Sequence, residues 1–124
     1  EAEAYPGPSL VIGYAPCEMH SIKGGMTNCQ AEMKRAVDCG YWNMFRYNPS
    51  LKAEGKNPFT VDSKVPATEG YRAFLMNEAR YSALTRSFPE RAETLFTEAE
   101  QNSVARYDHL LRLQALYAPA EKKD

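Results

Sequence analysis

The stretch Ser9–Met26, SLVIGYAPCEMHSIKGGM, constrains the fold of this chain more than any other. Its short apolar run Leu10–Ile12 has β-type residues, which predicts a buried strand. Pro16 cannot donate a ladder hydrogen bond, so the strand is expected to end just before Cys17. A thiol at the carboxyl end of a strand lies where open α/β sheets keep ligands and cofactors. The simpler interpretation is a strand that enters a surface turn with a buried, packing cysteine.

Length and composition limit the class of protein. The chain has 124 residues, which allows one domain or part of a larger one. Apolar residues are 44% and charged residues 25%, as in ordinary globular proteins. A net charge of −1 gives no electrostatic reason to expect a nucleic acid or an acidic membrane as partner. No apolar run approaches the roughly 20 residues that span a bilayer, and no secretory signal opens the chain. We therefore expect a cytoplasmic protein.

The cysteines agree with a reducing compartment. Cys17, Cys29 and Cys39 are an odd set without the dense spacing of a disulfide scaffold. Cys17 and His20 have the spacing of half a zinc site, but Cys29 and Cys39 lie about 15 Å apart along one predicted helix. A self-contained zinc site is therefore not expected. A nucleophile–base pair of Cys17 and His20 is not expected either, because three residues around a turn rarely align such a pair.

The opening residues Glu1–Ala4, EAEA, have two interpretations. They match the remnant of a yeast secretion leader, which would not be native sequence. They also fit the last turn of a helix that began before residue 1, with Tyr5–Pro8 as its stop signal. We favour the second interpretation because these residues run directly into the predicted strand. On that view the chain is a fragment.

The first half of the chain is predicted to continue as helix and strand. Thr27 or Asn28 can cap a helix through Cys39, and Gly40 can end it in a left-handed conformation. The apolar face of this helix is predicted to carry Cys29, Met33, Ala36 and Val37. The polar face is predicted to carry Gln30, Glu32, Lys34, Arg35 and Asp38. The aromatic run Tyr41–Tyr47 predicts a second strand, and Phe59–Val61 a short extended piece.

The second half has the pattern of two long helices. Apolar residues follow a 3.6-residue period from Thr68 to Ser87. Phe88–Glu90 then ends one helix and begins the next, since proline is tolerated in a first turn. The second helix is expected to reach Pro119, which gives an antiparallel hairpin. The tail Glu121–Asp124 is expected to be frayed.

Several motifs follow one another in a recognisable order. They are GPSLVIGYAPC, IKGGM, CGYW, RYNP, GKNPFT, FLMNEARY and FPERA. Together they closely resemble the C-terminal end of the pyruvate:ferredoxin oxidoreductases, from Glu1 to about Tyr117. The resemblance implies an α/β fold: residues 1–66 would end a thiamine-diphosphate-binding domain of short strands and a helix, and residues 67–124 would form a C-terminal helical hairpin and tail.

The resemblance also implies a function. Such enzymes use thiamine diphosphate and Mg²⁺ to decarboxylate pyruvate oxidatively, and coenzyme A collects the acetyl group. Electrons pass through 4Fe–4S clusters to ferredoxin or flavodoxin, and the full-length enzymes are typically homodimers or larger. By this resemblance Cys17 is the fourth thiolate of the cluster nearest the thiamine, and the remainder of the oxidoreductase chain supplies the other three.

The chain departs from the family pattern in places. Glu18-Met19 follows the cysteine where a small or polar pair is frequent, Gly13 replaces a common alanine, and Asn28-Cys29 stands where a Lys-Ser type pair is frequent. The Gly-Asp-Gly…Asn segment that holds Mg²⁺ and diphosphate is missing, as are the other cluster cysteines. The chain alone is therefore expected to bind none of these cofactors and to hold no catalytic residue. Two alternatives remain: a freestanding helical interaction or scaffold module with Cys17 as a packing residue, and a relative that acts on another 2-oxoacid or is fused to another reductase.

Overall fold

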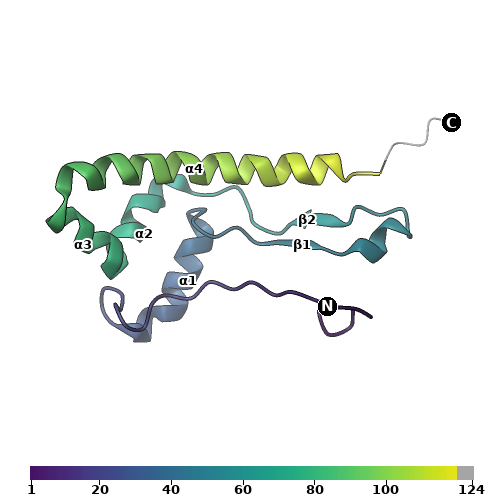
Figure 1. Ribbon diagram of the computed structural model, residues 1–124, viewed down its shortest axis with the longest axis horizontal. Helices are drawn as coiled ribbons and strands as arrows, with labels where there is room; N and C mark the ends of the chain where they lie inside the picture. The colour runs from purple at the N-terminus through teal and green to yellow at the C-terminus, as the bar shows by residue number, and fades with distance from the viewer. Residues whose placement is uncertain (120–124) are drawn as a thin grey trace.

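A computed structural model describes residues 1–119, so the expected fraying of the tail lies outside the described residues. The described part combines helices with one small sheet (Figure 1). In chain order its elements are the 3-10 turn Met26–Asn28, α1 (Cys29–Asp38), β1 (Phe45–Tyr47), the 3-10 turn Pro49–Lys52, β2 (Phe59–Val61), the 3-10 turn Thr68–Gly70, α2 (Tyr71–Asn77), α3 (Ala79–Ser87) and α4 (Pro89–Leu116). No helix in residues 1–119 is both long and apolar enough to cross a membrane.

The predicted strand Leu10–Ile12 is not formed among the described residues. This segment runs as an extended trace along the lower edge of the molecule (Figure 1). The side chains of Leu10, Val11 and Ile12 are 83%, 79% and 66% exposed. The prediction of burial is wrong for this chain by itself, because an apolar strand needs a neighbouring strand and a covering layer, and the described residues supply neither.

The sheet contains two antiparallel strands. Phe45 of β1 pairs with Val61 of β2, and Tyr47 with Phe59. Only the last three residues of the predicted strand Tyr41–Tyr47 join this ladder. The preceding Tyr41 and Trp42 turn instead onto the hydrophobic core. The described residues therefore hold a small antiparallel hairpin, which packs against the C-terminal half of α4 (Figure 1).

Helix α1 has almost the predicted bounds, but its faces are not the predicted ones. Ala36 is buried as expected. Glu32, which the pattern placed on the polar face, is fully buried, whereas Met33 of the predicted apolar face is 37% exposed. The buried carboxylate is stabilised by a partner that lies far away in sequence: the side-chain amide of Asn77 donates to its Oε2 at 2.6 Å.

The predicted helix from Thr68 to Ser87 is broken into two. Glu78 has φ −82° and ψ 123°, which is an extended conformation, and it separates α2 from α3. Helix α4, predicted from Pro89 to Pro119, extends over 28 residues to Leu116. The chain turns from α3 into α4 at the predicted Phe88–Glu90, but the first helix is not the predicted long one: it is the short α3, and α2 lies beside α4 at an angle (Figure 1).

One aromatic-rich core joins these elements. Its buried members come from α1, the residue that follows it, α2 and α4, and they are Ala36, Cys39, Tyr71, Phe74, Leu75, Ala92 and Phe96. Two side chains of α4 also hold the turn after α1. Ser103 Oγ donates to the Gly40 carbonyl at 2.7 Å, and the Arg106 guanidinium donates to the same carbonyl at 3.1 Å.

Gly40→Ala is expected to destabilise the chain. Gly40 has φ +83°, and a Cβ there would lie 2.8 Å from Pro66 Cβ and 3.1 Å from Ser103 Oγ. A left-handed conformation together with this crowding should lower the free energy of unfolding by about 2–3 kcal/mol. Chemical denaturation of the two chains measures the difference.

Gly55→Ala is the matched control. Gly55 has φ +69°, but a Cβ there would meet no atom within 4 Å. It should therefore show only the cost of the backbone conformation, about 1 kcal/mol. Equal losses at the two glycines would contradict the crowding argument.

Candidate functional site

Cys17 lies in a tight turn and not at the end of a strand. The Ser21 amide donates to the Cys17 carbonyl at 2.8 Å and closes this turn, and Ser21 adopts φ +60°. The Cys17 thiol is half-buried and forms no disulfide. Its Sγ lies 3.1 Å from Nδ1 of His20. The structure thus brings together the two side chains that their spacing had been expected to keep out of alignment.

The turn is fixed to the break between α2 and α3. Ile22 forms an isolated antiparallel bridge with Glu78. The Lys23 amide donates to the Asn77 carbonyl at 2.8 Å, and the Ala79 amide donates to the Ser21 carbonyl at 3.4 Å. The extended conformation of Glu78 is what allows this pairing, because residues inside a helix use their own backbone groups. The break in the helix therefore positions the cysteine turn.

Arg80, in the first turn of α3, completes this arrangement. Its Nε–H donates to His20 Nδ1 at 3.1 Å. That nitrogen is therefore an acceptor, and it faces a cation. A histidine in this state is poorly placed to take a proton from Cys17, so the geometry does not favour a cysteine hydrolase.

A hollow of about 390 Å³ lies beside the turn. Its lining comes from the N-terminal segment, the turn after α1, and the α2–α3 junction: Tyr14, Ala15, Cys17, Tyr41, Glu78, Arg80 and Tyr81. The walls carry one buried carboxylate, one guanidinium and one thiol, together with three phenols. The hollow therefore has both charged groups and aromatic faces close to Cys17.

Two hydrogen bonds order the phenols of this hollow. The Tyr14 hydroxyl donates to the carboxylate of Glu78, which is only 7% exposed. The Tyr41 and Tyr81 hydroxyls lie 2.8 Å apart. Burial, followed by the bond to Glu78, raises the pKa of Tyr14 well above its ordinary value. Burial, followed by the bond to Tyr81, raises the pKa of Tyr41 in the same way.

The other cysteines lie apart from Cys17. Cys39 is buried in the core, where desolvation raises the pKa of its thiol. Cys29 lies on α1 with its Sγ 3.8 Å from the sulfur of Met33. Within residues 1–119, no group of three or more His, Cys, Asp or Glu side chains is arranged to hold a metal ion.

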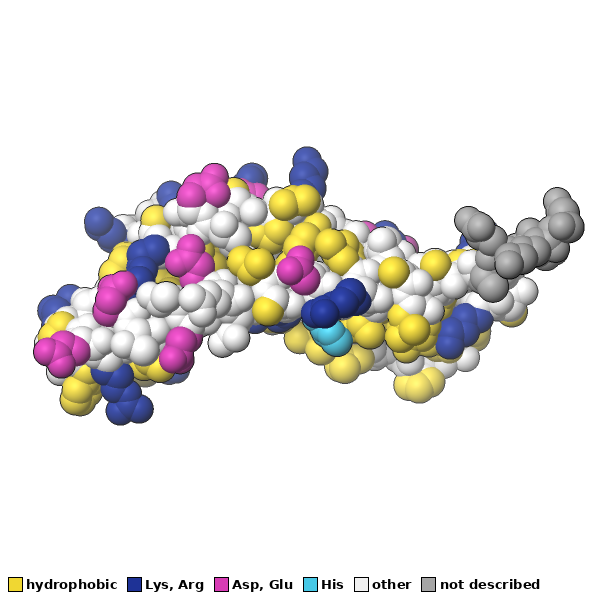
Figure 2. Space-filling view, turned by 90° about the horizontal axis from the view of Figure 1, so that it is seen from above, with side chains coloured by type: hydrophobic (Ala, Val, Ile, Leu, Met, Phe, Trp, Pro, Cys, Tyr) yellow, Lys and Arg dark blue, Asp and Glu magenta, His cyan; other side chains and the backbone are white. Residues whose placement is uncertain are grey.

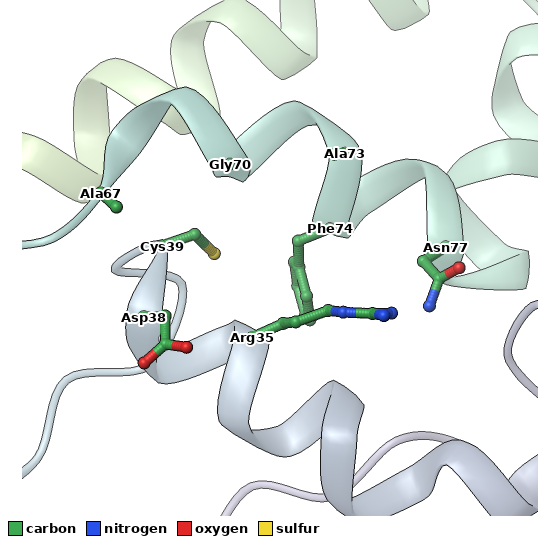
Figure 3. A pocket seen from close by; sticks show the side chains of 8 residues that line it. All are labelled: Arg35, Asp38, Cys39, Ala67, Gly70, Ala73, Phe74 and Asn77. Carbon is green, nitrogen blue, oxygen red and sulfur yellow. The ribbon is translucent and has the colours of Figure 1, made fainter.

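A second hollow, of about 420 Å³, separates α1 from α2. Figure 3 shows Cys39 and Asp38 near one end, with the long side chain of Arg35 directed toward Asn77 at the other. Arg35 also donates to the buried Glu32 carboxylate at 3.1 Å. Asn77 donates to the same carboxylate, and Asp38 pairs with Lys34, so the polar groups of this hollow already have partners and stabilise the contact between the helices.

Sequence reasoning missed Glu78, Arg80 and the phenols as neighbours of Cys17. The motif FLMNEARY reads as continuous helix, and nothing in it marks the break at Glu78. The separation in sequence is the reason: Arg80 lies 60 residues from His20. Local patterns carry no information about such a contact.

Comparisons with known proteins identify the class. No family model matches the chain. It is 53% identical over 113 residues to the pyruvate:ferredoxin oxidoreductase of Moorella thermoacetica, an alignment covering 91% of this chain and 9% of that protein. It is 50% identical, over 91% of its length, to the pyruvate-flavodoxin oxidoreductases of Klebsiella pneumoniae and Enterobacter agglomerans, of which it covers 10%.

These relatives are oxidoreductases by name, and the chain spans about a tenth of their length. It belongs to the family of pyruvate:ferredoxin and pyruvate-flavodoxin oxidoreductases. The family resemblance inferred from the motifs is thereby confirmed.

The raised pKa values predict a loss of stability in alkali. An unfolded tyrosine ionises near its ordinary pKa of 10.0, whereas folded Tyr14 and Tyr41 stay protonated to higher pH. The two tyrosines should therefore make their full contribution to the free energy of unfolding below pH 10. That free energy should fall as the pH rises above 10, because only the unfolded chain releases these protons. Denaturant unfolding at a series of pH values measures the slope.

Tyr14→Phe removes one of the groups whose pKa is raised in the folded chain. Its unfolding free energy should decline less steeply above pH 10 than that of the natural chain. A slope unchanged by this substitution would contradict the assignment of the shift to Tyr14.

Proposed function

We propose that this chain is the C-terminal part of a pyruvate:ferredoxin or flavodoxin oxidoreductase, in which Cys17 is a thiolate ligand of a 4Fe–4S cluster. The whole enzyme would decarboxylate pyruvate oxidatively with thiamine diphosphate and Mg²⁺, transfer the acetyl group to coenzyme A, and reduce ferredoxin or flavodoxin. The observation that carries the site proposal is a free, half-buried thiol on a turn that backbone hydrogen bonds hold in place.

The properties of Cys17 fit the chemistry of such a cluster. A 4Fe–4S cluster is held by four cysteine thiolates, which can come from distant segments. Cys17 is half-buried, whereas Cys39 is 3% exposed and packs in the core. No second cysteine among residues 1–119 joins Cys17 in a metal-binding group. The other three thiolates would come from the parent chain outside this segment.

The exposed N-terminal segment supports the proposal that this chain is part of a larger domain. Leu10, Val11 and Ile12 have β-type side chains and lie largely uncovered. We propose that residues 1–66 complete a thiamine-diphosphate-binding domain, in which this segment becomes a strand, and that residues 67–124 form the C-terminal helical part. The partners would then be the remainder of the chain and, in the cytoplasm, a second copy of the enzyme.

A freestanding helical interaction module is the second candidate. The shared aromatic core of α1, α2 and α4 favours it, because that core is built from this chain alone. Its mark would be a monomer that unfolds cooperatively and binds no iron after anaerobic reconstitution. The uncovered apolar segment 10–12 is harder to explain on this basis.

Cys17→Ser in the full-length oxidoreductase should remove one cluster. Iron and sulfide content should fall by the equivalent of one 4Fe–4S cluster, and one set of electron paramagnetic resonance signals should be lost, because serine replaces a thiolate ligand. Reduction of ferredoxin with pyruvate as donor should fall at least tenfold.

Cys29→Ser provides the matched control, since Cys29 is also a free, half-buried thiol. It should keep the iron content and the resonance signals of the natural enzyme. Full cluster content and unchanged ferredoxin reduction in Cys17→Ser would overturn the proposed ligand.

A further inference from the structure

We propose that Arg80 is a positioning residue that raises the reduction potential of the cluster held by Cys17. The proposal rests on the proposed function, because it takes Cys17 as a cluster ligand. It concerns a residue 63 positions further along the chain, brought beside the cysteine turn only by the fold.

The geometry places a fixed positive charge close to the ligand sulfur. Arg80 Nε lies 3.1 Å from His20 Nδ1, and the same nitrogen lies 3.1 Å from Cys17 Sγ. The guanidinium is therefore within two hydrogen-bond lengths of the sulfur. Arg80 and Cys17 also line the same hollow.

The position of Arg80 is built into the fold. The bridge between Ile22 and Glu78 holds the cysteine turn against the start of α3. Arg80 follows Glu78 by two residues, in the first turn of that helix. A displacement of the Arg80 backbone relative to the turn would have to break the Ser21–Ala79 or Lys23–Asn77 backbone hydrogen bonds.

Most N–H groups of the Arg80 side chain make no hydrogen bond among residues 1–119. A guanidinium carries five N–H groups, and among residues 1–119 only Nε–H of Arg80 makes a hydrogen bond. The terminal N–H groups can therefore turn toward a thiolate at Cys17. Hydrogen bonds to ligand sulfurs and nearby charge are two of the factors that set the potential of an iron–sulfur cluster.

The charge acts in one direction. Reduction adds an electron to the cluster, so a neighbouring cation stabilises the reduced state and raises the potential. An arginine side chain carries a permanent positive charge. The hollow is also lined by an acidic residue, Glu78. Its carboxylate is buried and accepts a hydrogen bond from Tyr14. Figure 2 shows the molecule from above, where basic and acidic side chains are interspersed over the surface.

The test is the midpoint potential in the full-length oxidoreductase, measured by electron paramagnetic resonance during a redox titration. Cys17→Ser first identifies which signal belongs to the cluster. In Arg80→Gln the midpoint potential of that signal should be more negative. The equilibrium constant for reduction should fall about tenfold, which corresponds to about 59 mV for one electron. Arg80→Lys keeps the charge and should restore most of the difference.

Arg86→Gln is the matched control. Arg86 lies on the same helix α3, is exposed, and does not line the hollow. It should leave the potential unchanged, which separates the local charge from the net charge of the enzyme. If Arg80→Gln fails to assemble the cluster, Arg80→Met, which keeps an unbranched side chain without the charge, is titrated in its place with the same expectation.

The possible failures are distinguishable. If Cys17→Ser removes the signal but the uncharged Arg80 variants have the same midpoint potential as the natural enzyme, this inference is overturned and the proposed function stands. If Cys17→Ser leaves every cluster signal intact, the ligand assignment is wrong and the role of Arg80 falls with it. An equal shift in Arg86→Gln would also overturn the inference.

Discussion

The pairing of Ile22 with Glu78 is the constraint on which the arrangement around Cys17 depends. It joins two segments that would otherwise be independent: a turn near the N-terminus and a helical region far along the chain. The helical region is interrupted at Glu78 so that this pairing can form. The buried carboxylate of Glu78 then needs a hydrogen-bond donor. Tyr14 supplies it by donating a hydrogen bond to the carboxylate. A single break thus fixes the turn, the hollow and the orientation of α3.

Much of the fold follows from local patterns. The glycine that follows α1 and the proline that begins α4 are predicted correctly from residue type, because turns depend on a few neighbouring residues, whereas Asn28 stands at the start of α1 without making a side-chain capping hydrogen bond. The family was recognisable for a different reason: several short motifs recur in a fixed order. Neither kind of information depends on contacts between distant segments.

The remaining features could not be predicted because they are properties of such contacts. Glu32 lies on the buried face of α1 because Asn77 supplies a donor there, and an amphipathic pattern cannot anticipate that partner. Likewise, Leu10–Ile12 has the composition of a strand, but strand formation requires an edge to pair with. The candidate site shows both limits at once: Cys17 and His20 were visible in the sequence, whereas Arg80 and Glu78 were not.

The uncovered segment 10–12 has a consequence for how such an enzyme is assembled. Three consecutive β-forming side chains beside an unpaired backbone are a template that accepts any available strand edge, including that of another molecule. During synthesis, this segment would be a point of self-association until its intended neighbours are folded. The adjacent Pro8 and Pro16, which cannot donate ladder hydrogen bonds, limit the length over which wrong pairing can spread. The two prolines on either side of the segment would therefore also limit aggregation of the newly synthesised chain.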